Sequence, residues 1–191
     1  MILVIDTSSA INALAILDGG SPQQVFLPAR SPDLVDRMRS MATAQSLTRV
    51  AVATGPGSFT GVRMGVSFAL GLAMGLRVPI VPLPTLQLQA ARSDRPVLAV
   101  SEAGRGRLYF LEPGGRQALA ELGDLPLDWP VVGWLQPSTQ AALQELGHRF
   151  QPDSGLRPFV EAAAEVLKTA RDVPYGSLKL EYMQSFAMQA K

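Results

Sequence analysis

The sequence contains no cysteine and a single histidine, His148, among its 191 residues. Without cysteine there is no disulfide framework, thiolate metal site or cysteine nucleophile. A metallopeptidase needs paired metal ligands, which one histidine does not supply. A Ser-His-Asp triad would need that same histidine, and the sequence has no Gly-x-Ser-x-Gly motif to supply the nucleophile. We therefore expect no metal site, and we place His148 near the C-terminus of a helix, where the helix dipole favours it.

Neither sign of charge predominates, because 17 Lys and Arg residues balance 16 Asp and Glu residues to a net charge of +1. A protein that binds nucleic acid on its own usually carries a basic patch or stripe, so we expect no such activity. The apolar run 64–76 gives about 20 Å of helix against a hydrocarbon core of about 30 Å, which predicts that it does not span a membrane. The first six residues lack the basic leader of a signal peptide, so we expect a cytoplasmic protein.

The segments that are present follow an α/β pattern. Three apolar strands are expected at 2–6, 11–17 and 23–27, followed by a helix at 32–46, a strand at 49–54 and a helix at 58–76. A strand at 78–82 and a short helix at 84–92 complete the series. Three meandering strands and then helix, strand and helix is the element order of a ribonuclease-H-like lobe.

The pattern restarts near residues 93–96. Strands fit 97–101, 106–111, 117–121 and 131–134, and helices fit 138–147 and 159–172. We predict a first lobe of residues 1–95 completed by helix 159–172, and a smaller second lobe of residues 96–158 and 173–191. The fold class is α/β, a two-lobed actin-like ATPase fold with a reduced second lobe.

The most informative stretch is the loop Gly55-Pro56-Gly57-Ser58, which joins a strand to a helix. The glycines permit backbone angles closed to other residues, the proline stiffens the loop, and Ser58 stands where a helix N-cap belongs. Such a corner can hold an anion, but the stretch is not a Walker A loop, because Lys and Ser/Thr do not follow Gly61. A tight structural turn is the simpler interpretation.

Small residues recur every four positions along the helix after this loop. One row is Gly61, Gly65, Ala69 and Ala73, and a second row is Ser67, Gly71 and Gly75. Each glycine costs up to about 1 kcal/mol of helix stability relative to alanine, so close backbone contact must compensate. The contact is either with the domain's own sheet or with a partner chain. Two smooth faces favour the partner, and on that hypothesis Gly65→Leu disrupts the pairing and leaves the fold intact.

Asp6, followed by Thr7 and Ser8, ends the first strand and is the best catalytic candidate. A carboxylate in this position could organise magnesium while the turn holds phosphate. Such sites need a second acid in the other lobe, and the sequence offers only Glu102 there. Two interpretations stay open: a vestigial phosphate site at Asp6, Thr7 and Ser8, or an aspartate that only stabilises its own turn.

These motifs together resemble the TsaB family, also called YeaZ, of the tRNA threonylcarbamoyladenosine pathway. The resemblance lies in the start Ile2-Leu3-Val4-Ile5-Asp6-Thr7-Ser8 and above all in residues 55–65, Gly-Pro-Gly-Ser-Phe-Thr-Gly-Val-Arg-Met-Gly. It continues through Gly71-Leu72-Ala73, Val78-Pro79-Ile80 and Thr85-Leu86. It covers residues 1–92 and weakens beyond them.

The resemblance implies a degenerate actin-like fold without catalysis of its own. It implies a scaffold that dimerises with the transferase TsaD and recruits the ATPase TsaE, and that forms a homodimer when TsaD is absent. We expect no cofactor on this chain, with ATP on TsaE instead, and only indirect contact with tRNA. Carried onto this sequence, the partner interface comprises Phe59, Gly61, Val62, Gly65, Ala69, Ala73, Leu34 and Met38.

The sequence departs from the family pattern at three places. Glu102-Ala103-Gly104 replaces the usual Asp-Ala-Arg, Tyr182-Met183-Gln184 lies where a Pro-x-Tyr-x-Arg pattern is usual, and Ser31 replaces a histidine. These changes bear on nucleotide contact and on the docking of TsaE. The alternative function at this stage is a small ATPase or phosphotransferase that uses Asp6 and the Thr7-Ser8 turn.

Overall fold

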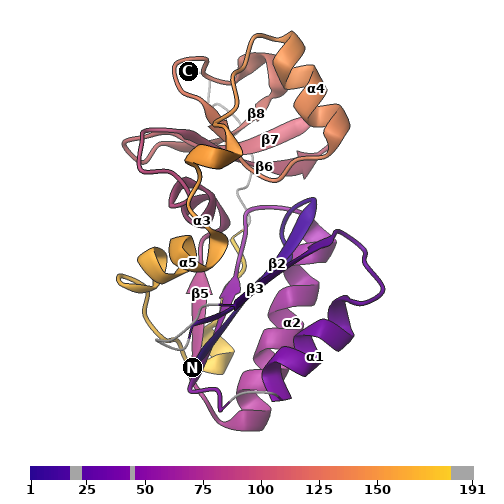
Figure 1. Cartoon of the computed structure of the whole chain (residues 1–191), viewed down its shortest axis with the longest axis vertical. Coiled ribbons are helices and arrows are strands. Elements are labelled where there is room, and N and C mark those ends of the chain that lie inside the picture. The colour runs from indigo at the N-terminus through magenta and orange to yellow at the C-terminus, as the bar shows by residue number, and fades with distance from the viewer. Residues whose placement is uncertain (18–22, 44–45, 182–191) are drawn as a thin grey trace, which may run out of the picture.

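The computed structural model describes residues 1–17, 23–43 and 46–181, and it has two lobes, one above the other in Figure 1. The first lobe holds a five-stranded sheet in the order β3-β2-β1-β4-β5, and the second holds a four-stranded sheet in the order β8-β7-β6-β9. The strands are β1 (Ile2–Asp6), β2 (Ile11–Leu17), β3 (Gln23–Pro28), β4 (Arg49–Ala53), β5 (Ile80–Leu83), β6 (Leu98–Gly104), β7 (Arg107–Leu111), β8 (Gln117–Glu121) and β9 (Val131–Val132). The helices are α1 (Leu34–Thr43), α2 (Phe59–Leu76), α3 (Thr85–Ala90), α4 (Pro137–Glu145) and α5 (Phe159–Leu167), with short 3-10 turns η1 (Leu122–Asp124), η2 (Asp153–Gly155) and η3 (Tyr175–Ser177).

The first sheet is covered on both faces because its central strands are apolar on both sides. Leu3 and Ile5 of β1 point to the face covered by α1 and α2, whereas Val4 points to the face covered by α3 and α5. This alternation is the two-residue period of a strand. Antiparallel β1, β2 and β3 are followed by β4 and β5, which run parallel to β1, so the α/β, ribonuclease-H-like order expected from the sequence is confirmed.

Within the described residues the chain crosses between the lobes twice, after α3 and before α5. At the crossing the Arg157 N–H donates to the Arg92 carbonyl oxygen over 2.6 Å. The Arg157 guanidinium donates to the Ala91 carbonyl oxygen over 3.1 Å and pairs with Asp94. The two crossing segments are therefore bound to each other.

The segment that follows α5 runs along the first lobe. Val173 pairs with Ile80, the Tyr175 hydroxyl donates to the carbonyl oxygens of Ala73 (3.2 Å) and Val78 (2.8 Å), and the Glu181 N–H donates to the Thr54 carbonyl oxygen (2.8 Å). The prediction that 173–191 belongs to the second lobe is therefore wrong for residues 173–181. The backbone donors and the tyrosine of this segment, which we call the strap, find their acceptors on β5, at the end of α2 and just after β4, all in the first lobe. Residues 182–191 lie outside the described part.

Helix α2 is, among the described helices, the one whose length and mean hydropathy, 1.4 over 18 residues, suffice to cross a membrane. Its buried residues Val62, Gly65, Ala69 and Ala73 face the first sheet. A core helix that covers a sheet has the same length and apolar composition. The packing therefore favours a sheet-covering helix over a membrane span.

Candidate functional site

Asp6 ends β1 with its side chain completely buried. One carboxyl oxygen, Oδ1, accepts hydrogen bonds from the Ser8 N–H (2.9 Å) and the Ser8 hydroxyl (2.5 Å), and Oδ2 has no hydrogen-bond partner among the described residues. Burial raises the pKa of Asp6 above its usual range, and the two bonds from Ser8 oppose that shift only in part. No group of three or more His, Cys, Asp or Glu side chains suited to a metal occurs among the residues that the structure describes. Asp6 is thus placed to hold its own turn.

The turn after Asp6 is joined to the start of α2. The Thr7 hydroxyl donates to the Gly61 carbonyl oxygen over 2.7 Å, and the Ser58 N–H donates to the Ser8 carbonyl oxygen over 2.7 Å. The Thr7 hydroxyl and the Ser58 N–H are groups that a bound phosphate would need, and both already donate to carbonyl oxygens of the chain. The predicted phosphate site, Asp6, Thr7 and Ser8, is therefore bonded directly to the predicted loop and the start of α2.

The loop 55–58 sits between three parts of the chain. Gly55 has φ 105° and lies against the Glu181 carbonyl of the strap, where a Cβ would approach that oxygen to 2.8 Å. A Cβ on Gly57 would lie 2.5 Å from the Ser8 carbonyl oxygen and 3.1 Å from Ser101 Oγ of the second lobe. Ser58 caps α2, its hydroxyl accepting from the Gly61 N–H over 3.3 Å. The loop therefore sets the direction of α2 through close backbone contacts.

The first row of small residues on α2 faces the sheet, not the outside. A Cβ added to Gly61 would overlap the Thr7 carbonyl oxygen, and one added to Gly65 would overlap Thr7 Oγ1. Ala69 and Ala73 are fully buried in the core of the first lobe. This row packs against β1 and the turn that follows it, so the prediction that the row forms the partner interface is wrong. The expectation that Gly65→Leu leaves the fold intact is wrong for the same reason.

Other residues of the predicted interface are buried as well. Leu34 and Met38 of α1 and Val62 of α2 are 2%, 0% and 4% exposed. Their apolar side chains fill the space between the helices and the sheet, as amphipathic helices do. Phe59 differs, because it is 57% exposed, with the Arg63 guanidinium 3.7 Å from its ring centroid. Of the eight predicted interface residues, seven point inward or sit at a close contact within the lobe.

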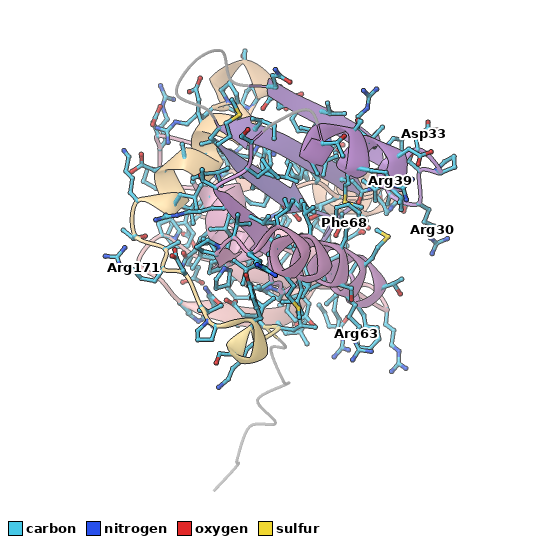
Figure 2. All side chains as sticks on the ribbon, turned by 90° about the horizontal axis from the view of Figure 1, so that it is seen from below. Arg30, Asp33, Arg39, Arg63, Phe68 and Arg171 are labelled. Carbon is cyan, nitrogen blue, oxygen red and sulfur yellow. The ribbon has the colours of Figure 1, made fainter. Side chains whose placement is uncertain are left out.

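The second row, Ser67, Gly71 and Gly75, lies on the outside of α2. A Cβ on Gly71 or Gly75 would meet no atom within 4 Å. A shallow groove of about 370 Å³ runs beside this row between α1 and α2, lined by Arg39, Ala42, Thr43, Ser67, Phe68, Gly71 and Leu72. Figure 2 shows Arg39, Phe68 and Arg63 on this side of the molecule, with α2 seen end-on. We call this surface the α1–α2 face; its exposed apolar side chains are Val35, Phe59, Met74 and Leu76.

In the second lobe, Glu102 is hydrogen-bonded to the start of α4 and not to Asp6. Its carboxylate accepts from the Gln136 N–H over 3.0 Å and from the Thr139 hydroxyl over 2.6 Å, at the N-terminal end of α4. A carboxylate is stabilised there by the unpaired amides and dipole of the helix. The only acid that the sequence offered as a partner for Asp6 is thus engaged elsewhere.

His148 follows α4 and is 6% exposed. Burial lowers the pKa of its imidazole below the usual range, and Nδ1 has no partner within the described residues. His148 is therefore a buried residue of the second lobe whose charged form is disfavoured by burial.

Sequence reasoning missed the residues that join the two lobes. Trp134, which follows β9, contacts Phe26 and Phe159 of the first lobe at ring-centroid distances of 5.7 and 5.6 Å, and Arg92 lies over its ring at 4.5 Å. A cavity opens beside them. The available signal was a tryptophan in a segment rich in proline and glycine, and such a signal does not indicate which distant segments of the chain the tryptophan contacts.

Comparison with known proteins gives consistent family matches. Residues 33–124 match the family model "TsaD: tRNA N6-adenosine threonylcarbamoyltransferase". The tRNA threonylcarbamoyladenosine biosynthesis protein TsaB of Escherichia coli is 33% identical over 124 residues, covering 58% of this chain and 54% of that protein. TsaB of Bacillus subtilis is 41% identical over 68 residues, covering 34% and 30%. The chain spans about half the length, or less, of these curated relatives.

Solved structures extend the match in fold. YeaZ from Pseudomonas aeruginosa superposes with a TM-score of 0.71 over 95% of this chain and 99% of that one, at 20% identity. A second structure, titled as an uncharacterised protein with similarity to peptidase YeaZ from the same organism, gives 0.74 over 96% and 99%, at 21% identity. At such identity the likeness confirms the two-lobed α/β fold alone. The sequence matches to TsaB proteins and the family-model match over residues 33–124 together support the TsaB (YeaZ) family for this chain.

Proposed function

We propose that this chain is a non-catalytic scaffold subunit in the biosynthesis of threonylcarbamoyladenosine, the t6A modification of the adenosine beside the anticodon in tRNA. Similarity to TsaB proteins supports the pathway, because the relatives in E. coli and B. subtilis carry the name of that biosynthesis. In this proposal the chain acts by dimerising with the transferase TsaD and by recruiting the ATPase TsaE. It contacts tRNA only through these partners, in the cytoplasm.

The observation that carries the proposal is the α1–α2 face. Met74 and Phe59 are 53% and 57% exposed, and Val35 and Leu76 are exposed on the same two helices. Large exposed apolar side chains on helices that line a shallow groove are typical of a protein-binding surface. The row Ser67, Gly71 and Gly75 leaves room for a partner helix to approach closely, and glycine in an exposed helix position has no stabilising role in the isolated lobe.

The assignment of a non-catalytic role is supported by the surroundings of Asp6. Its carboxylate is buried and bonded to Ser8, Glu102 is bonded to α4, and the turn hydroxyl of Thr7 is bonded to Gly61. A phosphotransferase built on Asp6 needs those groups free to hold metal and phosphate. We therefore favour the scaffold over the alternative ATPase, and we assign ATP to TsaE rather than to this chain.

The test is complex formation with purified TsaD, measured by co-elution and by calorimetry. Gly71→Leu places bulk on the open row of the α1–α2 face, so we expect binding to weaken by about 1–3 kcal/mol, roughly 5- to 150-fold in Kd. Gly123→Leu in the second lobe is the matched control, because a Cβ there also meets no atom within 4 Å, and it should bind like the wild type. The homodimer expected without TsaD should weaken in parallel.

Two results contradict the proposal. If wild-type protein does not co-elute with TsaD at micromolar concentration, the scaffold function fails. If it co-elutes and Gly71→Leu binds as tightly as Gly123→Leu, the function survives and the α1–α2 face is the wrong surface.

A further inference from the structure

A cavity of about 460 Å³ lies where the two lobes meet, within the roughly 300–1,000 Å³ common for small-molecule sites. The first lobe and the crossing segments contribute Ile11, Arg92 and Leu156. The second lobe contributes residues 131–135 around β9, Gln140 of α4 and residues 150–153. This cavity lies apart from the α1–α2 face and has no role in the proposed scaffold function.

Arg92 brings an incompletely bonded cation to the cavity. Its guanidinium lies 4.5 Å from the ring centroid of Trp134, and Nη1 donates to Gln89 Oε1 over 3.1 Å. Nε of Arg92 and Nε2 of the fully buried Gln89 have no hydrogen-bond partner among the described residues. Both groups are donors, and buried donors without acceptors are rare in proteins. Both atoms lie inside the wall, out of contact with the cavity, so it is the positive charge of the Arg92 guanidinium in the lining that suits an anion at this end.

Asp153 brings the opposite charge. It is exposed at the rim, and its charge acts on Arg92, although no ion pair joins the two side chains in the described structure. Arg92 and Asp153 are the charged residues of the lining, with neutral amides from Gln140 and Gln151 beside them. A polyphosphate is poorly matched, because the single cation is offset by a carboxylate. A ligand with one negative and one positive group matches both ends.

Apolar and aromatic side chains form one part of the lining, from Ile11, Trp134, Leu135, Phe150 and Leu156. Polar groups make up much of the rest, which suits a ligand whose charged groups are larger than its apolar part. We propose that this cavity binds a small zwitterion with an apolar side chain, either a free amino acid or a dipeptide. Its carboxylate meets Arg92, its ammonium meets Asp153, and its side chain lies against Trp134 and Leu156.

The experiment is a titration of the full chain with leucine and with leucyl-leucine, followed by tryptophan fluorescence and by calorimetry. In a Trp129→Phe background Trp134 is the remaining tryptophan and reports directly on the cavity. We expect saturable quenching by at least one of the two probes below about 10 mM. A response to leucine identifies a free amino acid site, and a response confined to leucyl-leucine identifies a peptide site.

Two variants test the contacts, with matched controls that keep the same chemistry outside the cavity. Arg92→Met and Asp153→Asn should each weaken binding at least about tenfold, whereas Arg95→Met and Asp128→Asn should leave it unchanged. Far-ultraviolet circular dichroism checks that each variant is folded. If neither zwitterion gives a saturable signal, or if inorganic phosphate or ATP binds and the zwitterions do not, the proposal is overturned. Equal binding by Arg92→Met and Arg95→Met overturns it as well.

Discussion

Gly65 and Gly71 are two glycines of one helix with opposite surroundings. A Cβ on Gly65 would overlap Thr7 Oγ1, whereas one on Gly71 would meet no atom within 4 Å. We expect Gly65→Ala to lower the free energy of unfolding by about 1–3 kcal/mol through overpacking. Gly71→Ala should raise it by up to about 1 kcal/mol, because alanine favours the helix. Urea denaturation measures both, and equal shifts for the two variants would contradict the assignment of the inner and outer rows.

Asp6 gives the stability of the protein a dependence on pH. Its pKa is raised in the folded state by burial, so the folded protein holds this proton more tightly than the unfolded chain does. The contribution to stability is full below the unfolded pKa of about 3.9, and it is lost as pH rises through the folded pKa.

We therefore expect Asp6→Asn to be at least as stable as the wild type at neutral pH. The asparagine oxygen can still accept from Ser8, and no buried carboxylate needs to ionise. Urea denaturation of both proteins at a series of pH values checks this. The contrary result is a wild type that gains stability relative to Asp6→Asn as pH rises from the unfolded pKa of Asp6 through its folded pKa. That result would show that the carboxylate is stabilised in its charged form.

The strands and helices of the first lobe could be predicted from sequence because their local signals are strong. Short continuous apolar runs located β1 and β2, and the Ser58 cap located the start of α2. The orientation of α2 could not be predicted, because a four-residue row of small side chains has the same spacing whether it faces a sheet or a partner. The contact that decides it, Thr7 against Gly61, spans 54 residues and leaves no local signal.

The site was harder to predict than the fold for the same reason. Asp6 and Ser8 were recognisable as a local motif, but the burial of the carboxyl depends on distant segments. Trp134 and Arg92 carried no motif, and their contact arises only when the lobes come together. The strap 173–181 likewise has little periodic pattern, and its place on the first lobe follows from single hydrogen bonds such as Glu181 to Thr54.

The relative position of the two lobes depends on Trp134 as well as on the crossing segments. The Ala10 N–H donates to the Trp134 carbonyl oxygen over 3.2 Å, and the ring lies among Phe26, Phe159 and Arg92. Trp134 therefore joins the second lobe to the first through its backbone as well as through its ring.

We expect Trp134→Ala to loosen the junction between the lobes while each lobe stays folded, because the lost ring contacts join one lobe to the other. Amide hydrogen exchange should quicken by about tenfold or more at residues 10 and 134, a local loss of at least about 1.4 kcal/mol, with β1 and β6 unchanged. Leu127→Ala, an exposed position of the second lobe, is the control and should exchange like the wild type. Faster exchange throughout β6 in Trp134→Ala would instead mean that the tryptophan stabilises the second lobe itself, and the lobe-locking role would be lost.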